Sequence, residues 1–329
     1  MKKLLCINSK FEMPQFNLAT EEYLLKNSPY DVFMLYVNSP SIIVGKHQNT
    51  LSEINLDFVE KNNLHVVRRL SGGGTVFHDL GNLNYAWIMH GKQGKLIDFN
   101  KYTDDILAYL QSIPVEATRN KNNDLLIDGK KISGNAEHVL KNKLIHHGTL
   151  LFASELNKLN SAINSDLSKF EDKSVSSKRS MVTNIVHHLK KDMTMDEFRN
   201  GLFQYVINKH ENVEQYELTG HDLNEIKTNY REKYRSWEWN FGYSPKFLFS
   251  KELQINNKST SIKLNINKGL IKDIELSGNL LTNEEITIFK KYLIGLQHRK
   301  SVIRNCIEEE DFSSILTKLS ENDIMSLFF

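Results

Sequence analysis

The stretch RRLSGGGTVFHD at residues 68–79 holds three consecutive glycines, in a chain with only 16 glycines among 329 residues. It lies between two β-like runs, LHVV at 64–67 and NYAWIM at 84–89. A flexible linker is disfavoured because both flanks are apolar. Two interpretations stay open: a tight β-turn, or a loop whose bare N–H groups approach a phosphate or an adenylate. Arg68 and Arg69 favour the second, because guanidinium groups bind phosphate and carboxylate through paired hydrogen bonds.

The glycine run has the spacing of neither common nucleotide-binding fingerprint. A P-loop needs G-x-x-x-x-G-K-[ST] and a dinucleotide-binding turn needs G-x-G-x-x-G, and the chain contains neither. The glycines alone are therefore weak evidence, and their interpretation depends on two clusters further along the chain.

The first of these clusters is Lys130-Lys131-Ile132-Ser133-Gly134, directly after the β-like run DLLIDG at 124–129. A basic hairpin tip is one interpretation, since lysine side chains are mostly exposed. The other is a lysine held against the small-residue turn, where it bridges a phosphate and a carbonyl group. Such a lysine would stabilise the charge that develops during acyl transfer to AMP.

The second cluster is His146-His147-Gly148, in a strand-like run. Adjacent side chains of a strand point to opposite faces, so we expect at most one of these histidines in a given pocket and no metal site from the pair. His78 is a candidate for the same pocket. The chain has no Ser-His-Asp order and no Cys-His pair, so no covalent nucleophile on the protein is predicted.

The composition is that of an ordinary globular protein and disfavours several classes. The 42 lysines and arginines nearly balance 40 aspartates and glutamates, and a net charge of +2 gives no sign of nucleic-acid binding. Cys6 and Cys306 indicate two unpaired thiols in a reducing compartment. The N-terminal apolar run is too short for a signal peptide, and no run approaches the ~20 residues of a membrane-spanning helix. We therefore predict a cytoplasmic protein that binds no membrane.

The length predicts about two domains, at roughly 150 residues per domain. Thr103 is a candidate N-cap for one helix of the first domain, and Thr194 with Glu197 forms a capping box for another. We expect strands at 32–37, 41–46, 64–67, 84–89, 124–131 and 146–152, and helices at 17–26, 103–113 and 194–206.

Two changes of pattern divide the rest of the chain. Residues 153–192 are polar and rich in Ser, Lys and Asn, which predicts a helix-and-loop insertion of lower order. After 236–242, short strands are followed by helices at 282–293 and 312–319, the pattern of a small α+β domain. The predicted fold class is α+β, and the predicted domains are 1–245 and 246–329.

Several segments, taken together in their order and spacing, resemble the lipoate–protein ligase A family. They are RRLSGGGTVFHDLGNLN at 68–84, NNDLLIDGKKISGNA at 122–136 and HHGTLLF at 146–152. SSKRSMVTN at 176–184 and SWEWNFG at 236–242 extend the resemblance through the large domain, and the small C-terminal domain resembles that of the long bacterial form. The resemblance covers most of the chain, and the combination is far more specific than any single motif.

The resemblance implies a catalytic domain with the biotinyl/lipoyl transferase fold, a mixed β-sheet flanked by helices and related to class II synthetases, with the small domain as a mobile lid. It implies a two-step reaction in which lipoate and Mg²⁺-bound ATP give lipoyl-AMP and pyrophosphate. The amine of an acceptor lysine then displaces AMP. The implied acceptors are apo lipoyl domains of 2-oxo-acid dehydrogenase E2 subunits and the glycine cleavage H protein, and we expect the enzyme to be a monomer.

The resemblance also implies roles for individual residues. Lys131 would be catalytic, contacting both the acyl carbonyl and the α-phosphate. Asp124 is the candidate Mg²⁺ ligand. The lipoate or lipoyl-AMP would contact Arg69, Ser71, Gly72, Gly73, Gly74, His78 and His147. The nucleotide would contact Val76, Phe77, Asn82, Asp124, Lys131, Ala136, Lys178 and Arg179.

The chain departs from the family pattern at two places. The family's Arg-Asn-Asp-Leu motif is split here by extra residues between Arg119 and Asp124. We align Asn123 and Asp124 with the Asn-Asp of the motif, which leaves Arg119 without a role. Leu70 stands where some relatives have a third basic residue.

Other functions stay open as alternatives. A carrier-to-carrier acyltransferase would need a cysteine nucleophile, and neither cysteine lies in a matched motif. A non-catalytic lipoate or adenylate sensor would not need Lys131. Biotin ligation is a more distant alternative.

Overall fold

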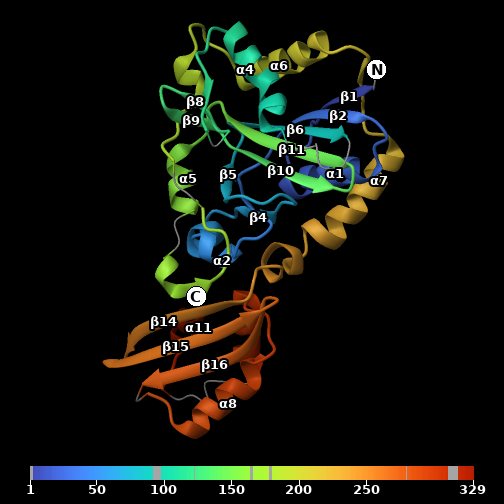
Figure 1. Cartoon of the computed structure of the whole chain (residues 1–329). Helices are drawn as coiled ribbons and strands as arrows, with labels where there is room; N and C mark the ends of the chain where they lie inside the picture. Colours follow the sequence, from blue (N-terminus) through green and yellow to red (C-terminus); the bar gives the residue numbers. More distant parts are fainter. Residues whose placement is uncertain are drawn as a thin grey trace. The chain divides into compact units, whose positions relative to one another are not determined.

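The computed structural model describes residues 3–91, 98–121, 123–163, 166–177, 180–278, 280–309 and 318–329. The chain forms two compact units, whose course along the sequence can be followed by colour in Figure 1. The larger unit comprises Met1–Lys46, Ile54–Asn164 and Ser176–Ser236, and the smaller comprises His47–Glu53, Ser165–Val175 and Trp237–Phe329. The smaller unit therefore includes two short segments that precede its main part in the sequence.

A six-stranded mixed sheet organises the larger unit (Figure 1). Strand β1 runs parallel to both of its neighbours, and the other pairs are antiparallel. This arrangement confirms the predicted α+β fold with a mixed sheet. In spatial order the strands are β10 (Asn135–Leu140), β11 (Lys143–Leu151), β6 (Asn82–His90), β2 (Asp31–Val37), β1 (Leu4–Asn8) and β13 (Val213–Gln215).

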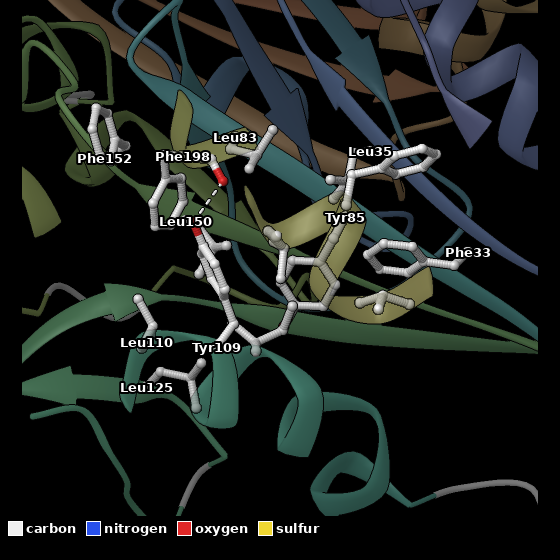
Figure 2. Close-up of a cluster of buried hydrophobic side chains, with 14 of the residues drawn as sticks. Phe33, Leu35, Leu83, Tyr85, Tyr109, Leu110, Leu125, Leu150, Phe152 and Phe198 are labelled. Atoms are coloured by element: carbon white, nitrogen blue, oxygen red, sulfur yellow. Dashed lines mark hydrogen bonds between the residues drawn. The ribbon is translucent and has the colours of Figure 1, made fainter. Parts of the chain in front are cut away.

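One face of this sheet carries the main hydrophobic core, which Figure 2 shows in close-up. Side chains such as Phe33 of β2 and Tyr85 of β6 pack there with those of helices α4 (Phe99–Ser112) and α6 (Met195–Lys209). Tyr109 Oη of α4 donates to the carbonyl oxygen of Phe198 in α6 at 3.0 Å, the dashed line in Figure 2. The core thus holds both helices against the sheet.

The opposite face of the sheet is partly polar. Because strand side chains alternate between faces, Tyr36, Asn84 and His147 point away from the main core. Helix α1 (Pro14–Asn27) covers this side and adds Leu24 and Leu25 to a second apolar cluster. The candidate site is built on this second face.

Two small sheets carry the motifs that the sequence singled out. In one, β3 (Ser41–Val44) lies between β4 (His65–Arg68) and β5 (Val76–His78), and the glycine run links the two outer strands. The other joins β7 (Thr118–Arg119), β8 (Leu125–Ile127) and β9 (Lys130–Ser133). The β8–β9 turn places Asp128 and Gly129 at φ of 49° and 73°, the hairpin turn expected of Asp-Gly.

Short elements complete the larger unit. They are α3 (Leu56–Lys61), α5 (Leu156–Ala162), α7 (Gly220–Asn229), the 3₁₀ turn at Ile185–His188 and the π-helical turn at Tyr230–Tyr234.

The start of α4 differs from the prediction. Thr103 is not the N-cap: the helix begins a turn earlier, and Asp98 caps it by accepting from the backbone N–H of Lys101 at 3.2 Å. Thr103 is buried within the helix, where its hydroxyl accepts from Arg119 Nε at 2.9 Å. The capping box of Thr194 and Glu197 is confirmed.

The smaller unit pairs an antiparallel sheet with helices. Its core includes Phe249, Leu264 and Phe289. The strands, in spatial order, are β12 (Phe170–Asp172), β14 (Phe247–Ile255), β15 (Lys258–Asn267) and β16 (Leu270–Gly278). The described helices and helical turns are α2 (Thr50–Glu53), the 3₁₀ turn η1 (Leu167–Lys169), the π-helical turn η4 (Glu238–Gly242), α8 (Asn283–Leu293), α9 (Lys300–Glu309) and α11 (Glu321–Phe328). Helix α8 was expected, α9 and α11 were not, and the helix predicted at 312–319 falls mostly outside the described residues. No described helix is long and apolar enough to cross a membrane.

Candidate active site

The glycine loop, residues 69–75, folds around the side chain of Arg69. Arg69 Nη2 donates to the carbonyl oxygens of Gly72 at 2.6 Å and Gly74 at 2.7 Å, and Nη1 donates to that of Ile43 at 3.0 Å. Gly73 has a φ of +86°, and a Cβ atom there would lie 3.2 Å from Nη2. This left-handed conformation and close approach are why a glycine is needed at this position.

The two adjacent arginines, Arg68 and Arg69, have different partners. Arg68 is fully buried, and its Nη1 donates to the carbonyl oxygens of Gly45 at 2.9 Å and Lys46 at 3.1 Å. Through these two bonds it holds the chain just after the end of β3. Burial lowers the pKa of Arg69 to about 10, against the opposing effect of nearby Glu21.

A buried chain of hydrogen bonds, the Ser71 network, starts at Arg69. Arg69 Nε donates to Ser71 Oγ at 3.0 Å, and Ser71 Oγ lies 2.5 Å from His147 Nε2. His147 Nδ1 lies 2.9 Å from Glu21 Oε2, and Tyr36 Oη donates to Glu21 Oε1 at 2.8 Å. The structure thus brings together three predicted lipoate-binding residues, Arg69, Ser71 and His147.

Glu21 is a member of this network that sequence reasoning missed. It lies in α1 and is only 3% exposed. The signal was present, because Glu21 is three residues after Leu18 and four before Leu25, on the apolar stripe of the helix. A carboxylate on a buried stripe requires polar partners, which here are His147 and Tyr36.

The two adjacent histidines face opposite sides of β11, as predicted. His146 is buried on the main-core side, with Nδ1 2.9 Å from Glu137 Oε1 and its ring centroid 5.3 Å from that of Tyr102. Among the described residues, no group of three or more His, Cys, Asp and Glu side chains could hold a metal ion. Of these two adjacent histidines, only His147 faces the site.

His78, at the end of β5, is buried beside the Ser71 network. Its Nδ1 lies 3.0 Å from Asn38 Nδ2. Burial, with smaller effects of Arg69 and His147, lowers the pKa of His78 to about 3. The imidazole is therefore neutral at physiological pH.

Lys131 forms a second group, the Lys131 cluster, with Asp124, Asn120 and Gly134. Lys131 Nζ lies 2.8 Å from Asp124 Oδ1, and a Cβ atom on Gly134 would lie 3.2 Å from Nζ. Asn120 Nδ2 donates to Asp124 Oδ2 at 3.3 Å, and Asn120 Oδ1 accepts from the Asp124 N–H at 3.0 Å. The lysine is therefore held between a carboxylate and a small-residue turn.

Arg119, next to Asn120 in the sequence, contacts helix α4. Arg119 Nη2 donates to Asp104 Oδ1 at 2.6 Å and to the carbonyl oxygen of Asn100 at 2.8 Å, so it anchors helix α4. Asn120, which sequence reasoning did not single out, reaches back to Asp124 instead.

The segment 176–183 connects both groups. Ser177 Oγ accepts from the Thr75 N–H at 2.8 Å, at the end of the glycine loop. Further along, the Lys131 N–H donates to the carbonyl oxygen of Met181 at 2.8 Å, and the Thr183 N–H donates to that of Lys131 at 3.1 Å. Lys178 and Arg179 lie between these anchors and outside the described residues.

The remaining predicted nucleotide contacts lie on strands around these groups. Val76 and Phe77 pair with β3, and Ala136 pairs with His147 across β10 and β11. Asn82 is buried at the start of β6, where its Nδ2 donates to Asn84 Oδ1 at 3.0 Å.

Strand β11 joins the Ser71 network to the Lys131 cluster. Thr149, two residues after His147, donates its N–H to the carbonyl oxygen of Gly134 at 3.1 Å. Thr149 Oγ1 accepts from the Gly134 N–H at 3.3 Å. The arrangement offers backbone N–H groups, a lysine and a neutral histidine around one sheet face, which suits an anionic ligand with an uncharged part.

Comparison with known proteins shows which family this chain belongs to. A model described as the lipoyl protein ligase A/B catalytic domain matches residues 13–207, and one described as the bacterial lipoate protein ligase C-terminus matches 244–328. The lipoate–protein ligase LplJ of Bacillus subtilis is 38% identical over 98% of both chains. The family resemblance of the sequence is thereby confirmed.

Two solved structures share the fold. A lipoate–protein ligase A bound with ATP has a TM-score of 0.62 at 22% identity, covering 74% of this chain and 99% of that one. A bipartite lipoate–protein ligase from Thermoplasma acidophilum, described with its E2 lipoyl domain, has a TM-score of 0.62 at 23% identity, covering 74% and 96%.

The buried neutral His78 predicts a pH-dependent stability. Its folded pKa of about 3 lies below the ordinary 6.5, so the unfolded chain binds more protons between these values. The stability from this group is full above pH 6.5 and is lost as the pH falls toward 3. Lowering the pH from 7 to 5 should reduce the free energy of unfolding by ~2 kcal/mol more in the wild type than in His78→Gln.

The measurement is urea unfolding of the larger unit, followed by Trp87 fluorescence with Trp237 and Trp239 of the smaller unit replaced by phenylalanine. An equal loss of stability in the two proteins would contradict the assignment of a buried neutral His78.

Proposed function

Because the chain belongs to the lipoate–protein ligase family, its reaction is the ATP-dependent joining of lipoate to a protein, and we propose how its residues divide the two steps. In the first step a lipoate carboxylate oxygen attacks the α-phosphorus of ATP, and pyrophosphate leaves. In the second, the uncharged amine of an acceptor lysine attacks the lipoyl carbonyl and AMP leaves. The amine gives up a proton as the amide forms.

Lys131 is the proposed catalytic residue, and its position is the observation that carries the assignment. Its ammonium group is pre-positioned by Asp124 at 2.8 Å and by the close approach of Gly134. A fixed positive charge stabilises the negative charge that develops on the α-phosphate and the acyl oxygen. No rearrangement of the lysine is then needed as the bond forms.

The glycine loop is the proposed cradle for the acyl-phosphate linkage. In a trans peptide the carbonyl and the following N–H point in opposite directions. Since Arg69 binds the carbonyl oxygen of Gly72, the Gly73 N–H points away from the guanidinium, and Gly73 is exposed. This supports binding of an anionic oxygen by Gly73, with Gly72 and Gly74 beside it.

The lipoyl and nucleotide parts are assigned to the two sides of this loop. Support for the lipoyl side comes from the Ser71 network, which places Ser71 and His147 with Arg69 on the partly polar sheet face, near His78. Val76, Phe77, Asn82 and Ala136 are proposed for the nucleotide, together with Lys178 and Arg179. Segment 176–183 would cover the adenylate, which must be protected from water.

Asp124 is the residue that would hold Mg²⁺. Magnesium is commonly held by one or two carboxylates and the substrate's phosphates, so a single carboxylate such as that of Asp124 is enough. When bound there, the ion would supply positive charge to the phosphates.

We further propose that the acceptor is a lipoyl domain of a 2-oxo-acid dehydrogenase E2 subunit or the glycine cleavage H protein. The E2 lipoyl domain described with the Thermoplasma acidophilum ligase supports the first. Residues 1–245 would form the catalytic domain and 246–329 the accessory domain, a division supported by the family-model matches, one ending at 207 and the other beginning at 244.

Replacement of Lys131 by alanine should slow adenylation about a hundredfold or more, the usual cost of losing a charge-stabilising group in the transition state. The measurement is lipoate-dependent exchange of labelled pyrophosphate into ATP. Lys130→Ala is the matched control, because Lys130 is the exposed neighbour on the same strand and carries the same charge. Exchange at the wild-type rate in Lys131→Ala would rule out the proposed role.

Replacement of both cysteines by alanine should leave ATP-dependent lipoylation within a few-fold of the wild type. Burial raises the pKa of Cys6 to about 12, so it is not a thiolate nucleophile at neutral pH. Cys306 is half-buried, with Sγ 3.8 Å from the carbonyl oxygen of Tyr292. The assay is the intact mass of a lipoyl domain. Loss of turnover in a folded double variant would favour a cysteine-dependent acyltransferase.

A further inference from the structure

A chain of buried polar side chains from four separate segments ends at His78. Ser9 follows β1, Asn17 lies in α1, Asn38 follows β2 and His78 ends β5. Ser9 Oγ donates to Asn17 Oδ1 at 3.2 Å, and Asn17 Nδ2 donates to Asn38 Oδ1 at 2.8 Å. Asn38 Nδ2 lies 3.0 Å from His78 Nδ1. All four residues are buried, and the two asparagines are fully so.

Backbone carbonyl groups fix the direction of each amide. Asn17 Nδ2 also donates to the carbonyl oxygens of Phe11 at 2.8 Å and Val37 at 3.2 Å. A carbonyl oxygen only accepts, so the nitrogen of Asn17 must face both. The atom of Asn38 that meets this nitrogen must then be its oxygen, because two NH₂ groups have no acceptor between them. Asn38 therefore turns its NH₂ group toward His78.

The direction of Asn38 selects the tautomer of His78. An NH₂ group only donates, so His78 Nδ1 must accept and carry no proton. The low pKa of His78 keeps the ring neutral, and a neutral imidazole carries its single proton on the other nitrogen. His78 thus presents Nε2–H as a donor.

That donor has no acceptor among the described residues, although Nε2 is buried. A buried N–H without an acceptor costs free energy, and such groups are rare unless something else binds them. The donors of neighbouring Arg69, by contrast, already have acceptors. Its Nε donates to Ser71, and its Nη2 donates to carbonyl oxygens of the glycine loop.

We propose that Asn38, held by Asn17, is a positioning residue that sets His78 as an Nε2–H donor to an oxygen or sulfur atom of the acyl substrate. The inference rests on the proposed function, because it needs the acyl chain to lie beside His78. Lipoate has two kinds of acceptor, its carboxyl oxygens and its dithiolane sulfurs, whereas octanoate has only the oxygens. The two acids therefore distinguish which atom His78 binds.

The tautomer can be observed directly by NMR of the full chain labelled with ¹⁵N-histidine. The pattern of two-bond ¹H–¹⁵N couplings separates Nε2–H from Nδ1–H, and His78→Gln identifies the signal. We expect Nε2–H in the wild type and a partial or complete change to Nδ1–H in Asn38→Leu. Asn184→Leu is the matched control, since it removes a buried amide bonded to Ser154 and should leave the His78 signal unchanged.

A second variant keeps the test decisive if Asn38→Leu does not fold. In Asn38→Asp a carboxylate faces Nδ1 and draws a proton onto it, so the coupling pattern of His78 must change. An Nδ1–H signal in the wild type, or an unchanged signal in Asn38→Asp, would overturn the inference.

Binding is then measured by calorimetry with lipoate and with octanoate. Asn38→Leu and His78→Phe should each raise the Kd for lipoate about three- to tenfold, the loss expected for one hydrogen bond. An equal loss for octanoate identifies a carboxyl oxygen, and a loss for lipoate alone identifies a sulfur. Unchanged lipoate binding in both variants would refute the proposed contact. Wild-type protein that binds neither acid would instead count against the proposed function, while the tautomer result would stand.

Discussion

The buried guanidinium of Arg69 holds two carbonyl groups of the glycine loop and the hydroxyl of Ser71 at once. Burial of a charge is costly unless it is hydrogen-bonded and balanced, and here the loop carbonyls supply the bonds while Glu21 supplies negative charge nearby. A lysine could not replace it, because one compact ammonium group lacks the planar fork that reaches these acceptors together. The conformation of the loop and the start of the Ser71 network therefore depend on the same side chain.

This dependence changes the meaning of the sequence motif. The glycines after the arginines favoured a close approach to a ligand over a simple tight turn. The structure shows that Gly73 also allows a close approach to Arg69, and Gly74 a close approach to Ser177. The cation orients the loop, and we propose that the outward Gly73 N–H binds the ligand. Strand β11, hydrogen-bonded on both sides within the large sheet, then links this loop to the Lys131 cluster through Gly134. Loops anchored on such strands are suited to hold reacting groups in place.

Patterns that depend on neighbours along the chain were predictable. The Asp128-Gly129 turn, the capping box of Thr194 and the opposite faces of the two adjacent histidines all follow from local geometry. Contacts between distant segments were not. Thr103 resembled an N-cap by residue type, but Asp98 caps the helix a turn earlier, and the Thr103 hydroxyl accepts from the distant Arg119 instead. Glu21 became part of the site only because α1 packs across β11, and no local rule supplies that pairing. The roles of Arg68 and Arg69 diverge for the same reason.

The most direct test of the account is the intact mass of an apo lipoyl domain, and separately of apo H protein, after incubation with the pure enzyme, lipoate and Mg²⁺-ATP. We predict a gain of one lipoyl group that requires ATP, and the acceptor that gains it faster identifies the partner. Preformed lipoyl-AMP should replace lipoate and ATP together, because activation precedes transfer. No gain with ATP, but transfer from an already lipoylated carrier without it, would contradict an adenylate mechanism and the central position given to Lys131.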